Sequence, residues 1–257
     1  MELDNDNPGT STSSNGMDNR SVSFGSDTIG TFTFSGHGGS SVMGQWDDVT
    51  PNAYEEVWDT TASADVRIDG RSGDNLLTYD SPSFNGVMIK AAYQHDHSTA
   101  AGQSQDLGHY ADFGIHVSPE MVEGLTIGYG FGELEPNTSQ SIDNETLFVK
   151  YAVGGLTLGY QQSDTDGTAA TQDDESTGWG VTYAVNENFT IGYGERDYDD
   201  DTSTTTKVEQ NDKGFQASYT MGGMTIAGHM NENENVGGST DATNDKESYE
   251  FALTFAF

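Results

Sequence analysis

A nucleophile with a base beside it is the first requirement for covalent catalysis, and the sequence singles out no such pair. Serine, histidine and aspartate residues are plentiful, yet no local signature joins them into a catalytic set. The chain has no cysteine, which removes thiolate and disulfide chemistry. We therefore expect no enzyme, and keep an outer-membrane barrel enzyme as the weaker alternative.

Two short motifs carry residue types that bind metal ions. His95-Asp96-His97 offers imidazole and carboxylate ligands, but it lies at a predicted strand end with no companion ligand nearby, which favours a solvated loop. Asp164-Thr165-Asp166-Gly167 and the other acidic runs offer oxygen ligands for Ca²⁺, without the full pattern of a twelve-residue calcium loop. We expect no cofactor, with Ca²⁺ in the acidic loops as the alternative.

The charge of the chain is strongly negative, at 42 Asp and Glu against 9 Lys and Arg, or formally −33. Because such a surface repels phosphate backbones, we expect no nucleic-acid partner. The acids cluster between apolar segments, as in Asp199-Asp200-Asp201, and this clustering predicts solvated loops.

The elements that position these residues are predicted to be β-strands. The segment 125–129 (LTIGY) recurs as 156–160 (LTLGY) and 189–193 (FTIGY). Successive side chains of a strand point to opposite faces, so each copy has one apolar face and one face of Thr and Gly. An apolar outside with a small or polar inside is typical of a membrane barrel.

Thirteen alternating segments predict thirteen strands. They are 21–25, 31–36, 75–80, 87–95, 108–117, 125–134, 144–153, 156–164, 176–185, 189–198, 212–220, 224–231 and 246–257. Short turns near 26–30, 81–86, 118–124, 154–155, 186–188 and 221–223 alternate with long connections near 37–74, 96–107, 135–143, 165–175, 199–211 and 232–245. One rim with tight turns and the other with long loops is the pattern of an outer-membrane barrel.

The last segment has the clearest alternation in the chain. Its apolar positions are Tyr249, Phe251, Leu253, Phe255 and Phe257. A soluble protein seldom ends on such an apolar strand edge. This segment resembles the C-terminal signal of bacterial outer-membrane barrels, which the barrel-assembly machinery reads.

A second stretch carries a more specific resemblance. Residues 75–86 (NLLTYDSPSFNG) are similar to the segment that follows the constriction loop in general porins of Gram-negative bacteria. The resemblance implies a sixteen-stranded trimer in the outer membrane, in contact with lipid and lipopolysaccharide, that passes small hydrophilic solutes. Only two strand candidates precede the long stretch 37–74, so we expect a chain that lacks three N-terminal strands, with residues 1–19 as a polar loop or tail and 20–257 as the barrel.

In this family the long loop folds into the pore and faces basic residues on the wall. The resemblance makes the acids of 37–74 candidates for the constriction, and Ala53–Trp58 within it is predicted to form one helical turn. The candidate acids are Asp47, Asp48, Glu55, Glu56, Asp59 and Asp65, and the candidate basic residues are Arg67, Arg71, Lys90, Lys150 and Arg196. Strand parity puts Lys90, Lys150 and Arg196 on the lumen face, since a charge facing lipid costs about 2–4 kcal/mol at mid-depth.

The balance of these charges predicts the selectivity. Many relatives carry a basic residue where Thr78 stands, so the basic wall is thinned while the loops are acidic. We expect a pore that prefers cations. The remaining alternative is an acidic secreted β-protein or adhesin, which would be soluble without detergent.

Overall fold

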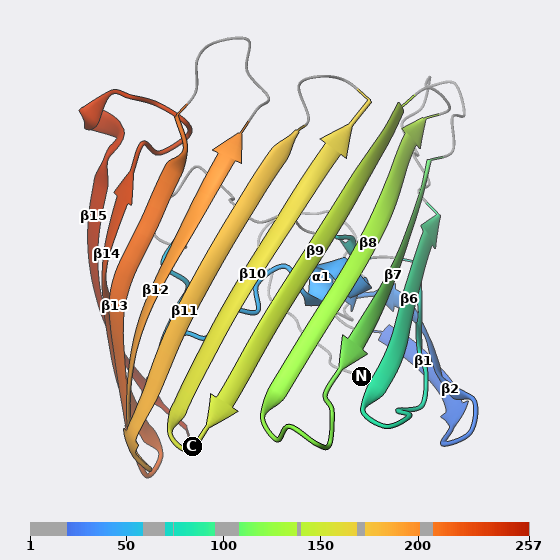
Figure 1. Ribbon diagram of the computed structural model, residues 1–257, viewed down its shortest axis with the longest axis horizontal. Helices are drawn as coiled ribbons and strands as arrows, with labels where there is room; N and C mark the ends of the chain where they lie inside the picture. The colour runs from blue at the N-terminus through green and yellow to red at the C-terminus, as the bar shows by residue number, and fades with distance from the viewer. Residues whose placement is uncertain are drawn as a thin grey trace, which may run out of the picture.

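The computed structural model describes residues 20–58, 70–73, 75–95, 108–137, 140–168, 173–200 and 208–256. Within them the chain forms one curved antiparallel sheet with a loop on its concave side (Figure 1). No helix of this part of the chain is long and apolar enough to cross a membrane.

Thirteen strands make up the large sheet, each paired with its neighbour in the chain. They are β1 (Arg20–Ser26), β2 (Gly30–His37), β5 (Leu76–Asp80), β6 (Val87–His95), β7 (His109–Val117), β8 (Leu125–Asn137), β9 (Gln140–Val153), β10 (Leu156–Gly167), β11 (Asp174–Asn186), β12 (Phe189–Asp200), β13 (Gln210–Met221), β14 (Met224–Glu234) and β15 (Lys246–Phe255). The predicted all-β antiparallel fold is confirmed, and each predicted strand has its counterpart.

The strands reach further toward the acidic rim than their apolar pattern indicated. The expected long connection at 135–143 is wrong, because β8 continues to Asn137 and β9 begins at Gln140. β10 likewise continues to Gly167, and β11 already begins at Asp174. Beyond the apolar band both faces of a strand meet water, so the backbone ladder continues while the acidic side chains stay solvated.

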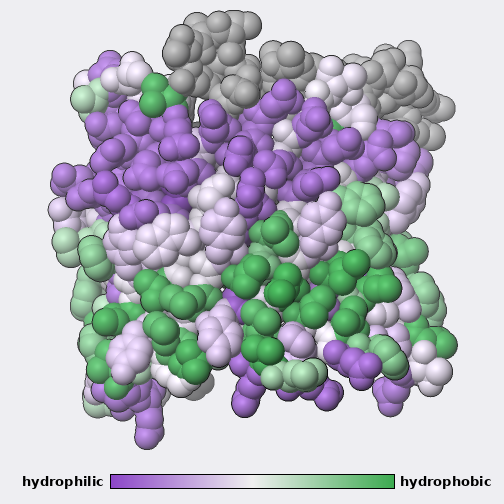
Figure 2. All heavy atoms as spheres, viewed as in Figure 1, coloured by the Kyte–Doolittle hydropathy of each residue, from purple (hydrophilic) through white to green (hydrophobic). Residues whose placement is uncertain are grey.

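The two faces of the sheet differ as the alternation predicted. Leu158, Ile191 and Phe255 are 44%, 42% and 52% exposed on the outer face. Their neighbours Gln161 and Gly192 lie on the inner face, buried under the loop. Figure 2 shows the outer side chains as a hydrophobic band over the half of the strands near the tight turns, with hydrophilic side chains above it. An apolar outer face is the arrangement that lipid requires.

The loop between β2 and β5 holds three short elements. β3 (Gly39–Ser40) pairs with β4 (Ser72–Gly73) as a small separate sheet, and α1 (Val42–Gln45) follows β3. A 3₁₀ turn, η1 (Ala242–Asn244), lies between β14 and β15. The helical turn expected at Ala53–Trp58 is wrong: the described helix of the loop lies at Val42–Gln45 instead.

Candidate functional site

The inner loop begins with a helix that is capped and pinned to the wall. Ser41 caps α1 by accepting from the Gly44 amide at 3.2 Å, and its hydroxyl also accepts from the Arg71 amide at 3.0 Å. The carboxylate of Asp112, buried on β7, accepts from the Met43 amide at 2.8 Å. Two of the orphan amides at the helix start are therefore satisfied, one locally and one by the wall.

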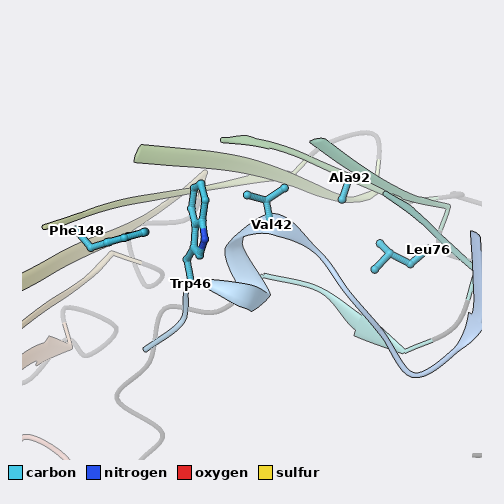
Figure 3. Close-up of a cluster of buried hydrophobic side chains, with 5 residues drawn as sticks. All are labelled: Val42, Trp46, Leu76, Ala92 and Phe148. Carbon is cyan, nitrogen blue, oxygen red and sulfur yellow. The ribbon is translucent and has the colours of Figure 1, made fainter. Parts of the chain in front are cut away.

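An apolar cluster supports this end of the loop from the same side. Val42 and Trp46 of the loop pack with Leu76, Ala92 and Phe148 of the wall (Figure 3). Trp46 is 5% exposed and meets Phe148 edge-on, with ring centroids 5.3 Å apart. The cluster keeps α1 on the inner face of β6 to β9.

Glutamine side chains of the wall hold the next part of the loop through hydrogen bonds to its backbone. Gln161 of β10 accepts from the Val49 amide at 3.1 Å and donates to the Trp46 carbonyl. Gln216 of β13 accepts from the Ala53 and Tyr54 amides at 2.8 and 3.0 Å and donates to the Glu55 carbonyl. These bonds fix the backbone of Ala53, Tyr54 and Glu55 against β13.

The last described residues of this part of the loop lie against β14. Asn233, fully buried, donates to the Val57 carbonyl at 3.1 Å. The backbone from Val42 to Trp58 therefore crosses the inner face from β7 to β14.

Glycines let the loop lie close to the wall between these anchors. A Cβ on Gly159 would collide with the ring of Pro51, and one on Gly180 would lie 2.6 Å from the Pro51 carbonyl oxygen. Such contacts are shorter than van der Waals packing permits, so the wall needs glycine at both positions. The loop thus lies on the inner face of the repeated strands, where the residues are small.

The predicted basic residue Arg196 lies beneath the loop and is only 2% exposed. Its guanidinium is 3.2 Å from the Asp48 carboxylate and stacks under Trp58, 5.5 Å from the ring centroid. The charges of Asp47, Glu56 and Asp212 also act on it. The loop covers this part of β12, so Arg196 is buried and paired, and its role as a basic residue of the pore wall stays a prediction.

The other predicted basic residues take different positions. Lys90 lies on the inner face, 2.6 Å from Asp80, and donates to Gln45 of α1 at 3.1 Å. Lys150 is half-buried on the same face as the buried Phe148. The backbone of Arg71 pairs with Ser41 near β4. Arg67, like the acids Asp59 and Asp65, lies outside the described residues.

Two acids of the loop lie near its far end. Glu56 accepts from Asn52 at 3.3 Å, and Glu55 reaches toward β14, where its carboxylate is 3.9 Å from Nδ1 of His229. Beside them the Tyr54 hydroxyl donates to Glu250 of β15. This hydrogen bond, with burial and the nearby charge of Glu55, raises the pKa of Tyr54 above its ordinary value, so the phenol stays protonated.

The remaining predicted residues lie away from the loop. The aromatic and aliphatic positions of the last strand point outward, with Tyr249 and Phe251 69% and 73% exposed and Leu253 and Phe255 about half exposed, while Phe257 lies outside the described residues. Acids of β10 to β12 and of the connection between β10 and β11 line one hollow of about 320 Å³ at the long-loop rim. They are Asp164, Asp166, Asp173, Asp174, Glu175 and Asp199. Calcium binding there stays a prediction.

Sequence reasoning missed the residues that hold the loop. They are Asp112, Gln161, Gln216, His229 and Asn233. All occupy lumen-facing positions on strands whose other lumen-facing residues are mostly small. A large polar residue among these Gly and Thr residues was the signal that the sequence offered. Their partners lie more than 60 residues away in the chain, which local pattern does not reveal.

Comparison with known proteins agrees with this architecture. The sequence pattern described as Gram-negative porin matches residues 1–238. The anion-selective porin from Comamonas acidovorans is similar in structure at a TM-score of 0.60 and 15% identity, over 84% of this chain and 67% of that one. A loop-deletion mutant of OmpT, an outer membrane protein of Vibrio cholerae, is similar at a TM-score of 0.62 and 12% identity. The match covers 93% of this chain and 79% of that one.

A porin refined at 1.8 Å resolution is similar at a TM-score of 0.65 and 17% identity, over 90% of this chain and 78% of that one. Comparison with curated proteins gave no match. The extent of the family match decides the class: this chain belongs to the Gram-negative porin family. It is an outer-membrane porin channel, with the porin barrel fold and a loop on its inner wall.

Proposed function

We propose that this porin is a diffusion channel for small hydrophilic solutes and ions that prefers cations. The observation that carries the proposal is the charge balance on the inner loop. In the described part of the loop, the charges of Asp47, Asp48 and Glu56 lie near the guanidinium of Arg196, which leaves an excess of negative charge there. A fixed charge beside a narrow aqueous path attracts ions of opposite sign and repels those of like sign.

The basic residues of the wall do not offset this excess. Arg196 is buried and paired with Asp48, and Lys90 is paired with Asp80 at 2.6 Å. Lys150 remains as a positive charge on the inner face. The Comamonas porin is anion-selective although its fold is similar, so charge placement rather than the barrel has to set the sign of the selectivity.

The test is the reversal potential of the channel in a planar lipid bilayer under a KCl gradient. We expect K⁺ to permeate better than Cl⁻, and the double variant Asp47→Asn/Glu56→Gln to lower the permeability ratio. The matched control is Glu133→Gln/Glu145→Gln, which removes the same charge from exposed outward positions of β8 and β9 and should leave the ratio unchanged. Anion preference in the wild-type protein would refute the proposal.

Salt provides a second arm of the same experiment. The Debye length falls from about 10 Å at 0.1 M to about 3 Å at 1 M salt. A preference that arises from loop carboxylates should therefore decline as the salt concentration rises. A permeability ratio that does not change with salt concentration would contradict a role of the loop carboxylates and indicate selection by pore size.

We also propose that the porin assembles as a homotrimer and contacts lipid, lipopolysaccharide and the barrel-assembly machinery. OmpT of Vibrio cholerae is similar in a trimer form, at a TM-score of 0.56 and 13% identity. The outward aromatic positions of β15 support recognition during assembly, and the exposed apolar band supports the lipid contact.

A further inference from the structure

Glu55, His229 and Glu250 converge where the inner loop meets β14 and β15. One ligand atom from each residue lies within 4.8 Å of the others. Glu55 comes from the loop, while His229 and Glu250 are paired positions of neighbouring strands. The three residues therefore join the loop to two neighbouring strands that are far from it in the chain.

The histidine of this group is buried with a ring nitrogen that has no partner. Its side chain is 0% exposed, and Nδ1 makes no hydrogen bond within the described structure. The other nitrogen, Nε2, lies 3.5 Å from the Ser248 hydroxyl. With the proton on Nε2 the ring donates to Ser248, and Nδ1 presents a lone pair toward Glu55.

Three electron-pair donors that face one another offer a site for a cation. Nδ1 of His229 and the Glu55 carboxylate are 3.9 Å apart, which is too long for a hydrogen bond. A metal bonded at about 2.1 Å to each atom would hold them up to about 4.2 Å apart. Shifts of less than about 1 Å in the flexible glutamates would complete that geometry.

We propose that Glu55, His229 and Glu250 bind one divalent first-row transition ion of the Zn²⁺ class. An imidazole with two carboxylates suits such an ion better than Ca²⁺ or Mg²⁺, which favour oxygen ligands alone. The Tyr54 hydroxyl, bonded to one oxygen of Glu250, would orient this ligand. The bound ion would fasten the loop to β14 and β15 and neutralise two lumen carboxylates.

The test is a calorimetric titration of the full chain, refolded in detergent, with Zn²⁺. Excess Ca²⁺ is present throughout to occupy the acidic rim. We expect one Zn²⁺ per chain, and a loss of affinity of at least about tenfold in His229→Asn and in Glu250→Gln. The control variant His109→Asn removes a histidine of β7 at the long-loop rim, 3.3 Å from Glu135, and should bind as the wild type does.

Substitution by Co²⁺ gives a second measurement, because its visible absorption reports nitrogen and oxygen ligands directly. Should His229→Asn fail to fold, the Co²⁺ spectrum of Glu250→Gln decides, and a spectrum identical to that of the wild type overturns the proposal. Absence of Zn²⁺ binding, displacement by Ca²⁺ or equal affinity in His229→Asn would also overturn it. None of these measurements uses ion flow, so their result is independent of the channel's selectivity.

Discussion

Arg196 shows how position changes the role of a charged side chain in this pore. It lies on the lumen face of β12, yet Asp48 and Trp58 of the loop cover it. Transfer of a guanidinium from water into such a site is unfavourable unless a carboxylate accompanies it. Arg196 therefore fastens the loop to the wall and contributes little free positive charge to the pore.

Removing its partner tests this role. Asp48→Asn leaves a buried guanidinium without its carboxylate, and we expect the free energy of unfolding in lipid vesicles to fall by about 3–5 kcal/mol. Asp80→Asn breaks the more exposed pair with Lys90 and should cost about 1 kcal/mol or less. Equal losses in the two variants would contradict the view that burial makes the Arg196 pair important.

At the scale of elements, the loop is held mainly through its own backbone. Gln161, Gln216 and Asn233 bond its amides and carbonyls, and each net bond contributes about 1 kcal/mol. Glycines on the same wall face permit this approach, as at Gly180 under Pro51. The loop conformation is therefore specified by the wall more than by the loop's own sequence.

A single methyl group on the wall tests this close approach. Gly180→Ala would place its Cβ 2.6 Å from the Pro51 carbonyl oxygen, so the loop must move. We expect an altered single-channel conductance and a loss of about 1–3 kcal/mol in the free energy of unfolding. Gly194, the register partner of Gly180, is the matched control, because the nearest loop atom to its new Cβ, Cγ1 of Val57, would lie at an ordinary contact distance of 3.4 Å. Wild-type conductance in Gly180→Ala would show that the loop does not rest there.

At the scale of the whole molecule, apolar and hydrophilic side chains on the outer surface lie at different positions along the strands. The hydrophobic band covers the half near the tight turns, and hydrophilic side chains cover the half near the long connections (Figure 2). On this face of the molecule the hydrophilic side chains of the described residues thus lie largely outside the hydrophobic band, where water solvates them. One protein can combine apolar strands with acidic connections because the strands are suited to lipid and the connections to water.

The proposed trimer is a prediction at this scale. Light scattering from the protein in detergent, corrected for bound detergent, should give the mass of three chains. A sample dissociated by heat calibrates the mass of one chain. A single-chain mass before heating would contradict the trimer and leave the fold unaffected.

Much of the fold could be predicted from the alternation of side chains, because period two is a local property. The pattern at 125–129 and its copies indicated the strand positions and which face is outward, and the structure confirms both. It underestimated strand length at the acidic rim, where both faces are polar and the alternation disappears. The candidate site was predicted less well, since Asp48 and Arg196 were identified individually but not as partners.

The sequence by itself determined the antiparallel strands, their apolar outer face and the surplus of acidic charge, because strand geometry and charge depend on neighbouring residues only. The tertiary structure alone decided that the loop follows the inner wall from β7 to β14, that Arg196 is buried, and that Glu55 meets His229 and Glu250. Those contacts join positions 148 to 195 residues apart, and only the closeness of wall and loop brings them together.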